Sequence, residues 1–188
     1  MMKIIFLDFD GVMNSDQSVE LHYHRWLEDG SPKGDIAFNG KNNTWCPLAI
    51  SNLEIILRKM PKIGIVISSS WRKNTPIQDL RSLFENHPII ARAMVDKTPV
   101  VNGKQRGYEI KQWIKYTEMT IDEFVILDDN RDMHGVMKHL VQTDPYHGFM
   151  RRDAEKALAI LGYVEVKEKM AIDLTAEEIA FRYGWCDE

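Results

Sequence analysis

Two acidic side chains stand directly after the first apolar run of the chain. Residues 4–7 are all apolar, and they are followed by Asp8, Phe9, Asp10 and Gly11. Phe9 points the other way along an extended chain, so both carboxylates lie on one side of it. Neighbouring carboxylates repel each other unless a cation sits between them. The pair therefore indicates a metal site.

Polar residues also follow two later apolar runs. Residues 64–67 lead into Ser68, and residues 123–127 lead into Asp128. In an open parallel sheet, ligands bind outside the carboxyl ends of the strands, where the strand order reverses. We therefore expect these groups to meet the first acidic pair at one sheet edge, although about 120 residues separate them. Carboxylates without His or Cys suit Mg²⁺. The predicted ligands are Asp8, Asp10, Asp128 and Asp129.

The pattern of apolar residues predicts strands that alternate with helices. Short apolar runs are typical of buried strands, and apolar residues three or four apart are typical of helices. This alternation favours a mostly parallel sheet covered by helices on both faces. The expected class is α/β, a three-layer α/β/α Rossmann-like fold with about five strands. The strands are expected at 3–7, 64–67, 89–95, 123–127 and 139–142, and the helices at 48–60, 76–86, 107–116, 151–161 and 175–183.

The chain is expected to form a single domain over residues 1–188, because no linker or internal repeat divides it. Residues 15–46 show no clean periodicity and contain turn-forming Gly, Pro and Asn residues, which predicts an insertion, such as a hairpin, that forms a flap or small cap. Residues 163–188 are expected to be a C-terminal helical extension.

Composition excludes several classes of protein. The apolar share of 44% and the charged share of 28% are typical of a soluble globular domain. No apolar run approaches the roughly 20 residues that span a bilayer, and the acidic pair interrupts any signal-like segment, so a cytoplasmic location is expected. Cys46 and Cys186 are expected to be free thiols. The net charge of −4 argues against an extended nucleic-acid-binding surface.

The ordered motifs resemble those of the haloacid dehalogenase (HAD) superfamily of phosphohydrolases. They are DFDGV at residues 8–12, IVIS at 65–68 and VILDD at 125–129, with a basic residue before a helix between the last two. SSWR at 69–72 and TDPYHG at 143–148 are similar to the HAD branch of RNA-repair and phage-type proteins. The resemblance covers about residues 3 to 148 and implies a HAD-like fold. No large cap is expected, because the insertion at residues 15–46 is short.

The resemblance also implies a role for each acidic residue. Asp8 would attack phosphorus and form an aspartyl-phosphate, since a carboxylate can accept a phosphoryl group. Asp10 would protonate the leaving oxygen and then deprotonate the hydrolytic water. Ser68 would hold the phosphoryl oxygens. Asp129, with Asp128 as its neighbour, would hold Mg²⁺ together with Asp8 and the main-chain carbonyl of Asp10.

Four further residues, with Gly11, complete the expected site. The basic catalytic residue is Arg106, at the start of a predicted helix, or Lys104, as the second candidate. Gly11 fits a tight turn at the strand exit, and Ser69 is expected beside the substrate. Arg72 is expected either to clamp a second phosphate or the substrate backbone, or to form a surface ion pair.

The expected function is Mg²⁺-dependent hydrolysis of a phosphomonoester, with a nucleotide, another phosphorylated small molecule or a polynucleotide end as substrate. Two alternatives stay open. One is a receiver-type phosphoacceptor signalling domain, although in receivers the adjacent acidic pair follows the first strand, whereas here it comes late. The other is a binding module that kept the fold without catalysis. No membrane partner is expected, and the oligomeric state stays open.

Overall fold

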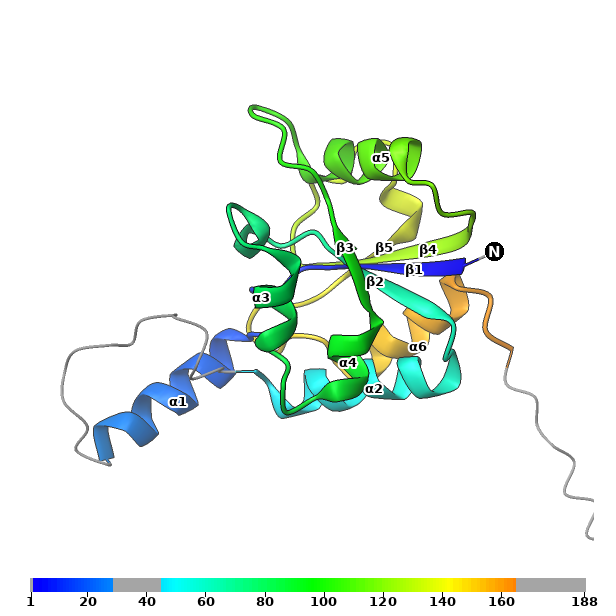
Figure 1. Cartoon of the computed structure of the whole chain (residues 1–188). Helices are drawn as coiled ribbons and strands as arrows, with labels where there is room; N and C mark the ends of the chain where they lie inside the picture. The colour runs from blue at the N-terminus through cyan, green and yellow to red at the C-terminus, as the bar shows by residue number, and fades with distance from the viewer. Residues whose placement is uncertain (1, 29–44, 165–188) are drawn as a thin grey trace, which may run out of the picture.

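The centre of the protein is a five-stranded parallel sheet in the order β3-β2-β1-β4-β5 (Figure 1). The structure is a computed structural model that describes residues 2–28 and 45–164. The α/β class and the number of strands are as the sequence predicts. The strands are β1 (Met2–Leu7), β2 (Ile63–Ile67), β3 (Met94–Lys97), β4 (Ile121–Asp128) and β5 (Leu140–Gln142).

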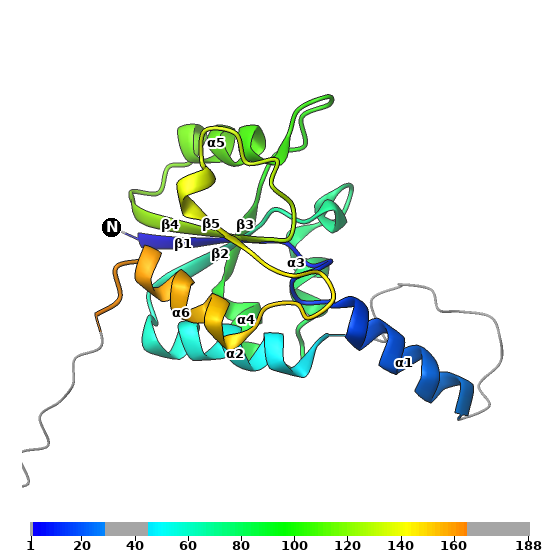
Figure 2. The same ribbon diagram turned by 180° about the vertical axis from the view of Figure 1, so that it is seen from behind.

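Helices cover both faces of this sheet. α5 lies over one face, and α2, α4 and α6 lie over the other, as two opposite views show (Figures 1 and 2). There are also two short 3-10 helices among the described residues. η1 (Ser70–Arg72) follows β2, and η2 (Met137–His139) directly precedes β5. The α-helices are α1 (Asp16–Glu28), α2 (Pro47–Lys59), α3 (Ile77–Ser82), α4 (Pro88–Ala93), α5 (Arg106–Tyr116) and α6 (Arg151–Ile160).

Alternation along the strands divides the core into two layers. Ile5 and Leu7 of β1 belong to the larger apolar cluster, with residues of α2 and α6. Ile4 and Phe6 belong to the cluster under α5, where Phe6 meets Trp113 edge to face. Successive strand residues point to opposite faces, so a strand buried on both sides must be apolar throughout. This explains why the central strands are continuous apolar runs.

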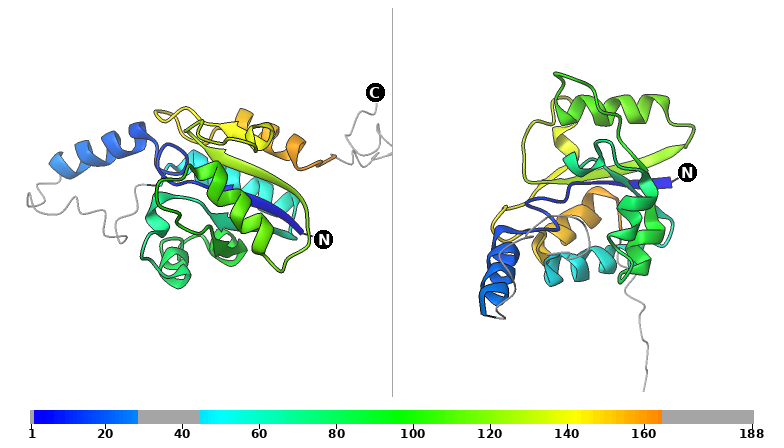
Figure 3. Two further views of the ribbon diagram at one scale, coloured as in Figure 1. Left: turned by 90° about the horizontal axis from the view of Figure 1, so that it is seen from above. Right: turned by 60° about the vertical axis from the view of Figure 1, so that its left-hand side comes forward.

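The strand order reverses between β1 and β4, and this places the site. The chain passes from β1 outward to β2 and β3, then returns to β4 beside β1 and continues to β5. Leu7 pairs with both Ile67 and Leu127, so these three strands end at the same level. The residues that follow them therefore meet at one edge of the sheet, which is seen from above in Figure 3.

Two predicted elements differ in the structure. Residues 89–95 were expected to be a strand, but α4 occupies Pro88–Ala93 and β3 begins only at Met94. Pro88 stands in the first turn of α4, where its missing N–H costs nothing, and the alanines favour helix. The helix expected at 76–86 is shorter, because α3 ends at Ser82.

The predicted insertion begins with a helix and not with a hairpin. α1 extends outward from the carboxyl edge of the sheet (Figures 1 and 3). It starts with a reciprocal cap, in which the backbone N–H groups of Ser15 and Ser18 each donate to the other's hydroxyl across 3.1 Å. The helix predicted at 175–183 and Cys186 lie outside the described residues. None of the described helices combines the length and the apolar character that a membrane-spanning segment needs.

Candidate active site

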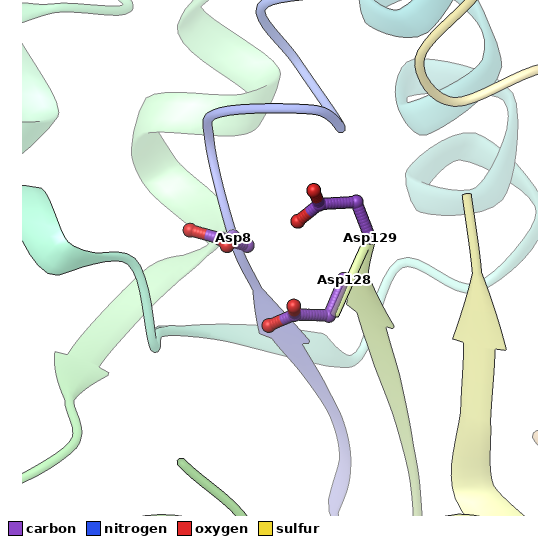
Figure 4. Close-up of side chains that lie close together, drawn as sticks. All are labelled: Asp8, Asp128 and Asp129. Carbon is purple, nitrogen blue, oxygen red and sulfur yellow. The ribbon is translucent and has the colours of Figure 1, made fainter. Parts of the chain in front are cut away.

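Three carboxylates from opposite ends of the chain meet at the carboxyl edge of the sheet. One oxygen each of Asp8, Asp128 and Asp129 lies within 4.8 Å of the other two (Figure 4). Asp8 follows β1 and Asp128 ends β4, the two strands at which the order reverses. Asp8 and Asp128 are buried, and Asp129 is half-buried. The sequence predicted this meeting from the order of the strands.

Short backbone hydrogen bonds fix two of these side chains. The N–H of Asp8 donates to the carbonyl of Leu127 across 3.0 Å, which ties the end of β1 to β4. Asp8 Oδ1 accepts from the N–H of Phe9 at 2.8 Å, and Asp128 Oδ1 accepts from the N–H of Asn130 at 2.9 Å. Each carboxylate is therefore oriented before any ligand arrives.

Gly11 lets the loop after β1 approach the cluster closely. Its φ is +70°, a left-handed conformation that glycine adopts without strain. A β-carbon at this position would lie 2.6 Å from Asp129 Cγ. The carbonyl of Gly11 also accepts from the hydroxyl of Thr143 at 2.8 Å, which fixes the turn. The tight strand-exit turn expected for Gly11 is present.

Arg106 is the basic residue that reaches the carboxylates. Its Nη1 pairs with Asp8 Oδ2, and it lies 2.5 Å from Asp128 Oδ2. Burial by itself lowers the pKa of Arg106, but the charges of Asp8 and Asp128 outweigh this effect and raise it. Lys104, the other candidate, is exposed, and its ammonium lies 5.5 Å from the centre of the Tyr108 ring.

The remaining negative charge is unfavourable without a cation. Burial, and then the charge of Asp8, raise the pKa of Asp128 to about 7. Burial and Asp8 also raise the pKa of Asp129. Three ionised carboxylates against the one guanidinium of Arg106 leave a charge of −2, which one divalent cation would neutralise.

Ser68 and Ser69 line the same edge. Both are fully buried, and their N–H groups donate to the carbonyl of Leu7 at 2.9 and 3.3 Å. Ser68 Oγ has no hydrogen-bond partner among the described residues, which is costly for a buried hydroxyl. The hydroxyl of Ser69 instead accepts from the N–H of Trp71 and so caps η1.

Asp10 lies on the exposed side of the cluster and is held by a tryptophan. The indole Nε1 of Trp71 donates to Asp10 Oδ2 across 2.8 Å. The Trp71 ring packs edge to face on Phe9 and beside Trp45, so the donor is fixed by the apolar cluster under the loop. Asp10 therefore has a defined orientation although it is exposed.

Arg72 differs from the expectation of a substrate clamp or a surface ion pair. Only 2% of the residue is exposed. Its five N–H donors go to five acceptors inside the protein, namely Glu109 and the carbonyls of Ser68, Ser69, Thr98 and Pro99. No donor of Arg72 is left for a substrate. The side chain instead connects three segments: the serine loop (residues 68–70), the segment that follows β3, and helix α5.

These features agree with the comparison of the chain with protein families. A family model described as "HAD domain in Swiss Army Knife RNA repair proteins" matches residues 4–154. The chain belongs to this family. The protein is thus a HAD-type hydrolase, and the receiver-type alternative is set aside. Neither the curated proteins nor the solved structures contain a significant match to the HAD chain.

The donor set of this HAD domain fits a divalent metal ion. The three carboxylates offer oxygen ligands only, and burial, followed by the charge of Asp8, raises the pKa values of Asp128 and Asp129, as expected for buried acidic groups that gather without a metal ion. Hard oxygen donors around a small site are typical for Mg²⁺. One oxygen from each carboxylate already lies within 4.8 Å of the other two, so the group could hold such an ion.

Sequence reasoning missed two residues that shape the HAD site, Trp71 and Glu109. Trp71 was only part of the SSWR motif, and nothing in its spacing pointed to Asp10. Glu109 accepts from Arg72 at 2.5 Å and from the N–H of Val101 at 2.8 Å. A further residue, Asp132, contacts the start of α5, where its Oδ2 accepts from the N–H of Arg106 at 3.3 Å.

Proposed function

We propose that this HAD-type hydrolase is a Mg²⁺-dependent phosphomonoesterase that acts through an aspartyl-phosphate. The observation that carries the proposal is the meeting of Asp8 with Asp128 and Asp129, within 4.8 Å, beside Arg106 and the unpartnered hydroxyl of Ser68. A carboxylate nucleophile next to a cation and a hydroxyl donor is what transfer of an anionic phosphoryl group requires.

In the first step a carboxylate oxygen of Asp8 forms a bond to phosphorus, and the bond from phosphorus to the leaving oxygen breaks. Asp10 donates its proton to that oxygen, which leaves as the alcohol. In the second step Asp10 takes a proton from water, and the water oxygen bonds to phosphorus. The bond to Asp8 then breaks, and inorganic phosphate is released. Asp10 serves as acid and then as base.

The transferring phosphoryl group would be held by groups that already face the edge. Arg106 offers charge-assisted hydrogen bonds, which are about twice as strong as neutral ones. Ser68 Oγ can donate to a phosphoryl oxygen, and this contact would supply the partner that its buried hydroxyl lacks. Arg72 supports this arrangement from behind, because its Nη1 fixes the carbonyls of Ser68 and Ser69 at 2.7 Å.

Mg²⁺ would be held by Asp8, Asp129 and the main-chain carbonyl of Asp10, with Asp128 beside them. When bound, it would reduce the repulsion between Asp8 and the incoming phosphate and stabilise charge in the transition state. Arg106 alone leaves the three carboxylates with excess negative charge, which supports a divalent ion in this role.

The substrate class proposed is a phosphorylated nucleotide or nucleic acid end. The matched family description names RNA repair proteins, which supports a phosphorylated nucleic acid as substrate. α1 extends outward at the carboxyl edge and covers no face of the sheet, so it does not enclose the site by itself (Figure 1). A site that α1 does not enclose suits a phosphate at the end of a larger molecule.

Phosphate release from a panel of substrates tests the proposal. The panel holds p-nitrophenyl phosphate, nucleotides, sugar phosphates and 3′- or 5′-phosphorylated oligonucleotides, each with and without Mg²⁺. We expect turnover that needs Mg²⁺ and that Asp8→Asn abolishes. Folded wild-type protein that releases no phosphate from any substrate would favour the non-catalytic module. A preference for sugar phosphates would exclude the nucleic acid assignment.

A further inference from the structure

A pocket of about 260 Å³ lies beside the carboxylate cluster and has no part in the proposed steps. The loop after β2 forms one wall with Ser70 and Lys73, and the loop between β3 and α5 forms another with Lys104. Arg106 also lines it, so the pocket and the cluster share a residue. A group bound there would lie next to the phosphoryl group held by Arg106.

The floor of this pocket is built from the buried pair Arg72 and Glu109. Arg72 fixes the serine loop and the carbonyls of Thr98 and Pro99, as described above. Glu109 Oε1 accepts from the N–H of Val101, which fixes the opposite wall. The pair neutralises its own charge and uses up the donors of Arg72. The pocket is therefore preformed, and its binding groups are at the rim.

The rim carries excess positive charge. Lys73 and Lys104 are exposed, and neither forms an ion pair with any described residue. Besides Glu109, the lining holds one acidic residue, Asp132, whose Oδ2 accepts from the N–H of Arg106. Gly103 directly precedes Lys104 in the loop that follows β3. A β-carbon built at Gly103 would have no heavy atom within 4 Å, so the pocket is open on the side of this loop.

We propose that this pocket binds a second phosphate group of the substrate, between Lys73 and Lys104. A lysine ammonium is a point charge that binds phosphate well, and the two wall lysines approach the pocket from separate loops. The volume is below that of a typical site for a whole small molecule, so a single phosphate with its neighbouring atoms is the appropriate occupant. This inference rests on the proposed function, which places the first phosphate at Asp8.

Two kinds of substrate can supply this second phosphate. One is the phosphodiester next to the terminal phosphate of a nucleic acid strand, and the other is the second phosphomonoester of a bisphosphorylated small molecule. A dinucleotide with a terminal phosphate represents the first, and a nucleoside 3′,5′-bisphosphate represents the second. The matching nucleoside monophosphate has the same leaving oxygen and one phosphate, so it is the reference.

The test measures the ratio of kcat/KM for each two-phosphate substrate to that for the reference. We expect Lys73→Ala with Lys104→Ala to lower this ratio about tenfold. We also expect the slope of log KM against log salt to fall by about 0.7 for each lysine that contacts a single-stranded backbone phosphate. Lys62→Ala, an exposed lysine at the opposite edge of the sheet, keeps the wild-type ratio and slope.

The possible outcomes distinguish failure of the second-phosphate site from failure of the proposed phosphatase activity. A drop for the dinucleotide alone assigns the pocket to nucleic acid, and a drop for the bisphosphate alone assigns it to a small molecule. If the enzyme is active and the ratio is unchanged, the proposal that the pocket binds a second phosphate is rejected, and the proposed phosphatase activity stands. If no substrate turns over, the pocket is tested by binding of a fluorescent 5′- or 3′-phosphorylated dinucleotide to Asp8→Asn. Equal affinity with and without the two lysine substitutions would reject the proposed phosphate site.

Discussion

The indole N–H of Trp71 donates a hydrogen bond to Asp10 Oδ2 across 2.8 Å, although 61 residues separate the two in sequence. Asp10 follows β1 and Trp71 lies in η1 after β2, so neighbouring strands bring them together. The hydrogen bond holds one oxygen of the Asp10 carboxylate and so orients the whole group. Trp71 is therefore a positioning residue for the acid proposed here.

The first prediction concerns Trp71→Phe, which keeps the ring but removes the donor. We expect kcat for nucleoside phosphates to fall about fivefold with little change in KM, because about 1 kcal/mol of orienting hydrogen bond is lost. Turnover of p-nitrophenyl phosphate should fall less, since nitrophenolate leaves without help from an acid. Steady-state kinetics on both substrates checks this.

Trp45→Phe is the matched control for that change. Trp45 belongs to the same aromatic cluster, and its indole N–H donates to the carbonyl of Leu83 instead of to a carboxylate. Equal losses on both substrates in Trp71→Phe, or the same pattern in Trp45→Phe, would show that the ring acts through packing alone.

The second prediction separates the two basic candidates. Arg106→Gln should lower kcat/KM about 100-fold or more on every phosphomonoester, because it removes the cation beside Asp8 and Asp128. Arg106→Lys should recover part of this loss. Kinetics on a substrate with one phosphate checks the assignment, and a larger loss for Lys104→Gln than for Arg106→Gln would contradict it.

The third prediction is that Mg²⁺ stabilises the protein more at pH 8 than at pH 5.5. The pKa of Asp128 is about 7 in the folded protein against roughly 3.9 unfolded, so the folded state binds this proton more tightly. Its contribution to stability is full below pH 4 and is lost as pH rises through 7. Mg²⁺ binds the ionised form, so its affinity should fall up to about tenfold per unit below pH 7.

Thermal unfolding with and without Mg²⁺ at both pH values measures this effect. Asp128→Asn should weaken the stabilisation by Mg²⁺ and flatten its dependence on pH. Asp122→Asn, which changes an exposed carboxylate at the other end of β4, should behave as wild type. A Mg²⁺ effect that is the same at both pH values would contradict the assignment of Asp128 to the site.

The fourth prediction follows from the burial of Arg72. Arg72→Met should lower the free energy of unfolding by about 3–5 kcal/mol, because it leaves Glu109 buried without its partner. Adding Glu109→Gln should recover part of that loss. Denaturant unfolding measures both. A raised KM at unchanged stability would instead restore Arg72 as the substrate clamp that the sequence suggested.

Much of the fold was readable because its signals are local. An apolar run that ends in a polar residue defines a buried strand and its carboxyl end, and the order of such runs gives a parallel sheet. Asp8 and Asp128 could therefore be placed together from the sequence. The predicted boundary between α4 and β3 was wrong. The secondary structure of such short segments depends on the strands beside them, since Met94 joins the sheet only by pairing with Ile65.

The sequence by itself determined, to within one residue, where β1, β2 and β4 end, and with them the carboxylates and serines at the carboxyl edge of the sheet. Only the tertiary structure decided how the loop side chains are used: Arg106 and not Lys104 reaches Asp8, Arg72 is buried against Glu109, and Trp71 holds Asp10. The physical reason is that backbone pairing fixes the level of residues at strand ends. The direction of a loop side chain depends on partners 37 or 61 residues away, which no local pattern contains.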